Sequence, residues 1–419
     1  MDTILRIFQK PELRKKVLFI LALLAVSQLM HSIPIPAIDA TRLRDFLSQN
    51  QIFSLVSTFT GGSLASLSIG MLGLGPYITA TIIMQLLTMI FPSLEQIYKH
   101  EGEAGRTKFN QYSRLLTVPL SYIQGYALMA LLIRQSILPQ LSLVETFGTL
   151  TIVTCGSLFL MWLGELISEK KLGNGVSLLI LAGIMASVPQ SLQQAAFSYT
   201  PDQLFTYIAF AVVALLVVVG VIWISEAQRN IPVHYARRVR GARQYGGVST
   251  YLPMRVNNAG VIPIIFALSI LLFPGMIANL FATSSIVIVA KIATFVTAFL
   301  QSNLWYSVLY FILVVVFTYF YTAITFDPNS IAENVQKSGG YIPGIRPGAQ
   351  TAAFLTHLIN RVTLVGALFL GLIAILPNIV RGATGVSAFT IGGTSVLIVV
   401  SVALEVMKQA QAQLSLYEY

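Results

Sequence analysis

Long apolar stretches recur from one end of the chain to the other, and they constrain its fold more than any other feature. A helix needs about 20 mostly apolar residues to cross the hydrocarbon layer of a bilayer. The stretches of this kind are residues 17–35, 75–92, 115–135, 148–167, 177–189, 204–224, 259–280, 304–325, 362–379 and 387–407. The sequence therefore predicts an all-α, polytopic membrane protein with ten transmembrane helices.

Charge and composition exclude the soluble classes of protein. Only 10% of the residues are charged and 55% are hydrophobic, whereas charged residues make up about 25% of a soluble domain. A soluble enzyme, a disordered regulator and a coiled coil are therefore excluded. The single cysteine, Cys155, and the four scattered histidines form no metal-binding pattern, and no phosphate-binding glycine loop is present. We expect no metal, no cofactor and no catalytic site.

The basic residues predict how the spans are oriented. With ten spans and the N-terminus inside, the outer side carries only five of the 26 basic residues, and both termini lie in the cytoplasm. These five are Arg42, Arg44, Arg134, Lys291 and Arg381. An eleventh span over residues 281–300 would worsen this asymmetry and place Lys291 inside the membrane, against the positive-inside rule. We therefore expect 281–300 to be an amphipathic helix along the outer interface.

Ten spans divide into two groups of five, and an odd number per group gives the groups opposite orientations in the membrane. This is the plan of inverted-repeat membrane proteins. We accordingly predict two pseudo-symmetric inverted halves, residues 1–190 and 191–419. The repeat is inferred from the topology alone, because the sequences of the two halves show no obvious identity.

Two long inner loops stand out from the other connections. Residues 226–257 hold six arginines with apolar residues at strand-like alternation, and residues 326–350 are rich in turn residues with Arg346 at the tip. Contact with anionic lipid is one explanation for such basic loops. Docking of an acidic partner such as a ribosome is the other. Ile345 and Pro347 flank Arg346, and a stiff turn of this kind favours specific docking.

The outer segment 36–74 begins polar and then becomes small and apolar, with many glycine and serine residues. It suits neither a lipid-facing helix nor an open loop. Gly61 and Gly62 would break or hinge a helix there. Two interpretations remain open, namely a re-entrant packing loop and a mobile stopper in a pore.

Six ordered motifs now identify a family resemblance over essentially the whole chain. They lie at residues 59–87, 101–114, 161–184, 237–266, 338–351 and 389–405. With these motifs the chain resembles the SecY family, the channel subunits of the bacterial Sec protein translocase. The resemblance implies a channel that passes unfolded secretory polypeptides across the cytoplasmic membrane. It also implies that membrane-protein segments leave sideways into the lipid through a lateral gate.

The same resemblance implies site residues. An apolar pore ring would consist of Ile78, Ile82, Ile180, Ile184, Ile265 and Ile398. Residues about 53–69 would form a plug, with Thr58, Phe59, Thr60, Gly61, Gly62, Ser63, Leu64, Ala65, Ser66 and Leu67 at its centre. Gln85 and Gln124 are candidate lateral-gate residues, although an amide in a span more often bonds to a neighbouring helix.

Partners also follow from the resemblance. The two inner loops would dock the SecA motor ATPase or the ribosome through Arg240, Arg243 and Arg346. Arg243 matches one member of a basic pair in the family, the other member is Ala242 in this chain, and Arg240 is the nearby candidate substitute. Small membrane subunits SecE and SecG, polypeptides that carry signal sequences, and anionic lipids are the other expected partners. The expected location is the bacterial cytoplasmic membrane.

Two other classes of protein compete with a passive channel. A secondary transporter on the same inverted-repeat plan would need ionisable residues near the middle of its spans. Glu165 and Glu405 lie instead near the inner ends of their spans. An intramembrane enzyme would need a nucleophile or a metal site in the spans, and no such grouping is present in the sequence.

Overall fold

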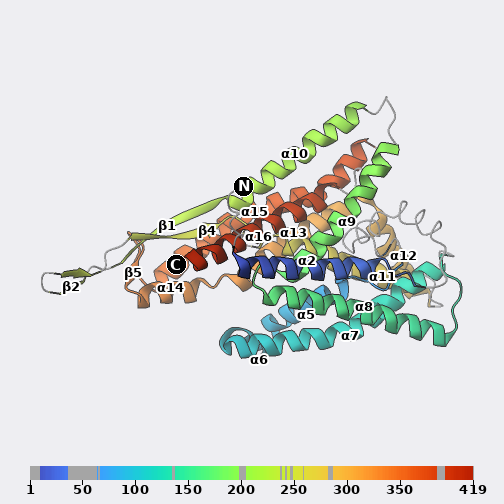
Figure 1. The fold of residues 1–419 in the computed structure, drawn as a ribbon, viewed down its shortest axis with the longest axis horizontal. Helices are drawn as coiled ribbons and strands as arrows, with labels where there is room; N and C mark the ends of the chain where they lie inside the picture. The colour runs from blue at the N-terminus through green and yellow to red at the C-terminus, as the bar shows by residue number, and fades with distance from the viewer. Residues whose placement is uncertain are drawn as a thin grey trace.

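The protein is seen here as a computed structural model dominated by long helices that run side by side (Figure 1). It describes residues 10–35, 64, 67–134, 137–197, 204–235, 238–240, 243–245, 249–257, 259–281, 286–384 and 392–418. The first group of helices is α2 (Pro11–His31), α5 (Gly75–Ile90), α6 (Pro92–His100), α7 (Gly102–Arg134), α8 (Leu143–Glu169) and α9 (Gly175–Phe197). The second is α10 (Leu204–Glu226), α11 (Ile262–Phe281), α12 (Val287–Gln301), α13 (Asn303–Thr325), α14 (Pro328–Lys337), α15 (Ala349–Thr384) and α16 (Gly392–Glu418).

Each of the ten predicted spans coincides with one helix, namely α2, α5, α7, α8, α9, α10, α11, α13, α15 or α16. Within the described residues, six helices are long and apolar enough to cross a membrane alone, and the pair α5 and α6, bent by 115°, makes a seventh. Pro189 lies inside α9 and Pro274 lies inside α11. The chain is therefore a multi-pass membrane protein, while the count of ten spans stays a prediction.

Several helices extend well beyond their apolar stretches. α7 has 33 residues and begins in a polar segment, and α15 has 36 residues. α16 continues past the apolar stretch to Glu418. These polar extensions project from the bundle on the side where the strands lie (Figure 1).

A small sheet covers that side of the molecule, which we call the strand end (Figure 1). Strands β4 (Ser249–Arg255), β1 (Gln228–Tyr235) and β5 (Gly340–Tyr341) are antiparallel neighbours in that order. A separate ribbon pairs β2 (Arg238–Arg240) with β3 (Arg243–Tyr245). The predicted strand-like alternation in residues 226–257 is therefore confirmed. It adds a small β element to a fold that is otherwise all-α.

The helices pack in two groups, α2 to α9 and α10 to α16, with two lines of contact between them. On one side α11 packs against α5 and α7, and on the other α16 packs against α9. The largest buried apolar cluster contains residues of both groups, whereas a second cluster is made by α7, α8 and the segment before α5. These contacts place the main core at the boundary between the predicted halves.

The extra helix α12 lies at the opposite end from the strands, beside α11 (Figure 1). Leu300 packs against Gly275 of α11, and Phe299 stacks on Trp305 at the start of α13. Lys291 is exposed on α12, and so are Ile292 and Phe295. An exposed face that is apolar but carries a lysine suits the interfacial helix predicted for residues 281–300, which stays a prediction.

Candidate pore and docking surface

The six predicted ring residues all lie in the largest buried apolar cluster of the described structure. They come from four helices, α5, α9, α11 and α16. None of them is more than 9% exposed, and Ile398 is fully buried. Both i, i+4 pairs lie on one face of their helix, as helical geometry requires. This cluster thus contains residues that are up to 320 positions apart in the sequence, from Ile78 to Ile398.

Local sequence explains why α9 presents its ring residues at this depth. Asn174 caps the helix, because its Oδ1 accepts from the backbone N–H groups of Val176 at 3.0 Å and Ser177 at 3.3 Å. Gly175 lies so close to the carbonyl of Gly164 on α8 that a Cβ atom would collide with it. The helix start is therefore pressed against α8, and this fixes the height of Ile180 and Ile184 in the bundle.

Most of the predicted plug lies outside the described residues, and only Leu64 and Leu67 of Thr58–Leu67 can be placed. Both are buried at 1% exposure in the second apolar cluster, with side chains of α7 and α8. The chain after them is tied down, since Ile35 N–H donates to the Leu67 carbonyl at 2.9 Å and Ile69 N–H donates to the Ile33 carbonyl at 3.1 Å. The end of the segment is therefore anchored to the residues that follow α2.

The two predicted gate residues differ in their surroundings. Gln124 on α7 is buried, and its Nε2 donates to Thr79 Oγ1 on α5 at 3.3 Å. This is a local bond between neighbouring helices and does not reach α11. Gln85 on α5 has a buried Oε1 that accepts no hydrogen bond. The gate assignment of both residues stays a prediction, and α11 packs directly against their two helices.

The two predicted docking loops join in a single sheet at the strand end. Residues 226–257 supply β1 and β4 of this sheet and residues 326–350 supply β5, with His234 opposite Tyr341. A third apolar cluster beneath the sheet contains Ile231, Met254 and Ile342. Arg240 and Arg243 face each other as backbone partners at the end of the β2–β3 ribbon. Loops far apart in the sequence therefore form one surface.

Arg346 is exposed at the tip of a stiffened turn. Gly344 and Gly348, on either side of it, adopt φ values of +80° and +97°, which favour glycine. The Thr351 hydroxyl donates to the Arg346 carbonyl at 3.0 Å, and the Ile345 N–H donates to the Ile342 carbonyl at 3.0 Å. The guanidinium pairs with no acidic side chain among the residues that the structure describes. The guanidinium is therefore exposed at the surface, and its docking role stays a prediction.

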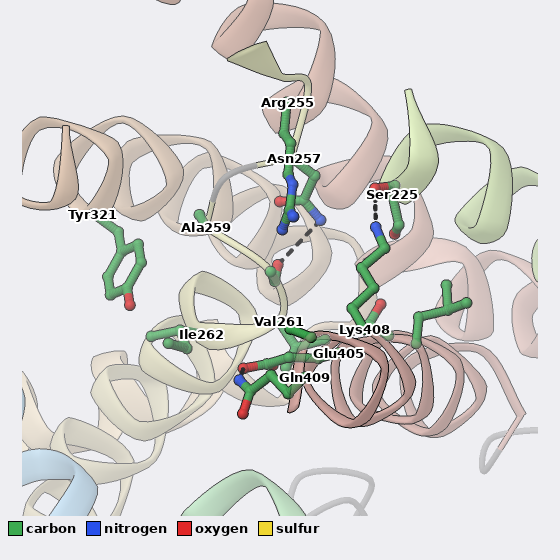
Figure 2. A pocket seen from close by; sticks show the side chains of 14 residues that line it. Ser225, Arg255, Asn257, Ala259, Val261, Ile262, Tyr321, Glu405, Lys408 and Gln409 are labelled. Carbon is green, nitrogen blue, oxygen red and sulfur yellow. Dashed lines mark hydrogen bonds between the residues drawn. The ribbon is translucent and has the colours of Figure 1, made fainter. Parts of the chain in front are cut away.

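A cavity of about 360 Å³ opens at the strand end, beside the ring helices (Figure 2). Its charged lining residues are Arg255 at the end of β4, together with Glu405 and Lys408 on α16. Asn257, Ser401 and Tyr321 add polar groups. The sequence places Glu405 only as an acid near the end of a span, and it does not predict the cavity. An acidic residue within an apolar helix was the signal that could have revealed it.

Comparison with known proteins identifies close relatives. A family model described as SecY matches residues 68–407. The protein translocase subunit SecY of Streptomyces coelicolor is 42% identical over 434 residues, which cover 99% of this chain and 98% of the relative. The protein of the same name from Corynebacterium glutamicum is 42% identical over 442 residues, with 99% and 98% covered. That from Mycobacterium tuberculosis is 41% identical over 428 residues, with 97% and 96% covered.

Solved structures share the fold. A protein-conducting channel superposes with a TM-score of 0.65 at 21% identity, covering 95% of this chain and 92% of the other. Sec61 in a canine ribosome–channel complex from the endoplasmic reticulum gives 0.62 at 21% identity, again covering 95% and 92%. At such identities the likeness concerns the arrangement of the helices. It supports the all-helical membrane channel architecture predicted from the sequence.

Proposed function

The chain belongs to the SecY family, and we propose that it is the protein-conducting channel of a translocase, with the six isoleucines as its constriction. One observation carries this proposal. Ring residues from both groups of helices are buried in one apolar cluster, which is the packing expected of a shut pore. An apolar constriction excludes ions by dewetting, yet it offers no hydrogen bond that would retain a passing polypeptide.

The plug and the lateral gate complete the mechanism. In the closed state the plug, residues about 53–69, blocks the pore on the side away from the strands. A signal sequence enters between α11 and the pair α5 and α7, which are in contact here. Its own hydrophobicity supplies the opening energy, because it exchanges protein contacts for lipid. Gln85 and Gln124 lie on the two helices that would part from α11.

The strand end is the proposed cytoplasmic and docking side. The joined loops carry Arg240, Arg243 and Arg346, and a ribosome or the SecA motor offers acidic groups to such a basic surface. Relatives of known structure include a channel bound to a ribosome. Both termini then lie in the cytoplasm and the membrane is the bacterial cytoplasmic membrane. α12 then lies on the outer face.

Small subunits would cover exposed helices of the bundle. Only 11% of the apolar stretch of α10 is buried inside the bundle, the lowest share among the six long apolar helices. Side chains such as Phe205, Leu215 and Trp223 are exposed along it. Lipid covers part of this surface, and we assign the remainder to partner helices of SecE and SecG. Anionic lipid headgroups would contact the basic residues at the strand end.

Reconstitution of the complete complex tests the proposed function. The chain would be purified with its small subunits, placed in vesicles of bacterial lipid, and supplied with the motor, ATP and a secretory precursor. We expect the precursor to become protected from protease inside the vesicles. Precursor that remains accessible, in vesicles whose complex is correctly assembled, would overturn the proposal. A precursor that lacks its signal sequence serves as the negative control.

A further inference from the structure

The cavity at the strand end continues the wall of the proposed pore. On α16, Ser401 and Glu405 follow Ile398 by three and seven residues, so they lie on the same helix face. Seven residues correspond to about 10 Å along the helix axis. On α11, Ile262 lines the cavity three residues before Ile265. The cavity therefore lies next to the constriction, on the side from which a polypeptide would enter.

Glu405 has no basic partner within ion-pair distance among the described residues. Its carboxylate accepts one hydrogen bond, from Gln409 Nε2 at 3.2 Å. Lys408, its neighbour on α16, is already engaged, because Lys408 Nζ contacts Glu226 Oε1 at 2.8 Å and points toward Ser225 (Figure 2). An acidic group near the membrane without a partner is costly and marks a functional site.

Two further acceptors in the cavity are also unused. Asn257 Oδ1 and Ser401 Oγ are buried and have no hydrogen-bond partner, although Asn257 Nδ2 donates to the Gly260 carbonyl at 3.4 Å. A buried polar atom without a partner destabilises the fold. With Glu405 they make a set of oxygen acceptors, which suits a ligand that is cationic and carries several donors. Lysine and arginine side chains have this chemistry.

Arg255 lies on the opposite wall, at the end of β4, and it is exposed (Figure 2). It makes no ion pair with Glu405 in the described structure, so the carboxylate is left available. An incoming cation competes with Arg255 for Glu405 through space. Because Lys408 is neutralised by Glu226, Glu405 and Arg255 are the two charges of the cavity lining that form no ion pair in the described structure.

From this geometry we propose that Glu405, with Asn257 Oδ1 and Ser401 Oγ, binds the basic residues that precede the apolar core of a signal sequence. Signal sequences carry a positively charged segment before an apolar one. A cation held at Glu405 places the residues that follow it level with Ile265 and Ile398, beside the gate helices. The site therefore keeps the basic end of the signal sequence at the strand end of the channel. This inference rests on the proposed function.

Binding of synthetic signal peptides tests the site without any transport. Two peptides share one apolar core and differ in the preceding segment, which is basic or neutral. The assembled complex in detergent should bind the basic peptide about fivefold tighter, which corresponds to about 1 kcal/mol at 1.36 kcal/mol per tenfold change. Glu405→Gln should abolish this difference and leave the neutral peptide unaffected. Glu333→Gln is the matched control, because Glu333 is exposed at the same end and pairs with Lys337 at 2.7 Å.

Transport in vesicles gives a second, independent readout. Glu405→Arg should lower the rate for a precursor with a basic leading segment and raise it for one with an acidic segment. Arg255→Gln should strengthen the basic preference, because a competitor for Glu405 is removed. An undiminished basic preference in Glu405→Gln would overturn the site. So would a preference that responds to Arg255→Gln alone, since the cavity would then recognise an acidic group.

Failure of the proposed function looks different from failure of the site. A complex that binds the basic peptide in a Glu405-dependent way but moves no precursor would uphold the site and contradict the channel. Normal precursor transport with the same charge preference in wild type and Glu405→Gln would uphold the channel and reject the site.

Discussion

Gln413 on α16 donates its side-chain amide to the carbonyl oxygen of Lys171, 2.7 Å away, across the boundary between the first five and the last five predicted spans. The same Nε2 lies 3.4 Å from the Lys170 carbonyl, and Gln413 Oε1 accepts from Lys16 Nζ at 3.2 Å. One amide therefore ties α16 to α2 and to the turn between α8 and α9. Gly173 in that turn also packs against Val406 of α16.

Replacing Gln413 by leucine should loosen this tie while keeping the size of the side chain. Each hydrogen bond contributes about 0.5–1.5 kcal/mol net, so the two halves should separate more readily. We expect increased export of a precursor with a defective signal sequence, by about threefold to tenfold for a loss of about 1 kcal/mol. Gln411→Leu is the control, because Gln411 is exposed on the same turn of α16. Equal export in the two variants would contradict a role for the tie.

The anchored end of the plug predicts a difference between two deletions. Removing residues 58–63 leaves Leu64 and Leu67 in the second apolar cluster, so the protein should fold normally and leak ions. Removing residues 58–67 also takes away both leucines. Each contributes about 1.5–3 kcal/mol through burial, so this variant should leak ions and also unfold at a lower temperature. Ion flux in vesicles and thermal unfolding in detergent measure the two effects separately.

Unchanged ion flux in the 58–63 deletion would contradict a plug in this segment. Equal thermal stability of the two deletions would contradict the anchoring of Leu64 and Leu67. Filling residues 58–67 with glycine and serine instead of deleting them keeps the chain length and gives the control for shortening.

The sequence predicted the helices well because the cost of burying backbone polar groups in lipid makes long apolar stretches helical. It underestimated their length, as in α7, whose first turns are polar and are held by packing against α6. Apolar periodicity carries no signal for such a segment. The helix α9 likewise continues past Pro189, although the apolar stretch ends there.

Long-range relationships were harder to predict than the elements themselves. The alternation in residues 226–257 predicted strands, but the pairing of β1 with β5 depends on a short segment near Tyr341 that has no strand signature. The ring residues were assigned through family resemblance, because isoleucines four residues apart are common in membrane helices. Gln413 and the cavity of Glu405 involve single polar side chains, whose partners only the folded structure reveals.

The exposed tip of the docking surface gives a prediction about the motor. Arg346→Glu should lower motor-stimulated export by about tenfold or more. The substitution replaces an exposed guanidinium by a carboxylate, which repels an acidic partner. Expression and thermal stability should be unchanged, since the side chain is exposed and makes no ion pair among the described residues. The readouts are precursor export and the ATPase activity of the motor on vesicles.

Lys337→Glu is the matched control for charge, since Lys337 lies in the same loop and pairs only with Glu333 in the described structure. If both reversals impair export equally, a general electrostatic contact with lipid explains the loop. Arg346→Lys adds a test of geometry, because lysine keeps the charge but loses the planar fork of donors. An intermediate defect there supports bidentate recognition of an acidic group.

Ile398 is the most informative position for testing the constriction, because it is fully buried in the apolar cluster that also contains the other five predicted ring residues. Ile398→Lys places a charge in an apolar cluster, which costs several kcal/mol in the closed state and much less once water enters the open pore. The balance between closed and open states should shift toward open. Export of a precursor with a defective signal should therefore increase, and resting ion conductance should rise with it.

The control is Ile398→Val, which removes one methylene and costs about 0.5–1.5 kcal/mol without adding a charge. A ring that works by excluding water should tolerate valine and fail with lysine. Export and conductance that are the same in the lysine variant as in wild type would mean that Ile398 packs in an ordinary core. In that case the constriction must be formed by other side chains, even though the six isoleucines lie together in one cluster.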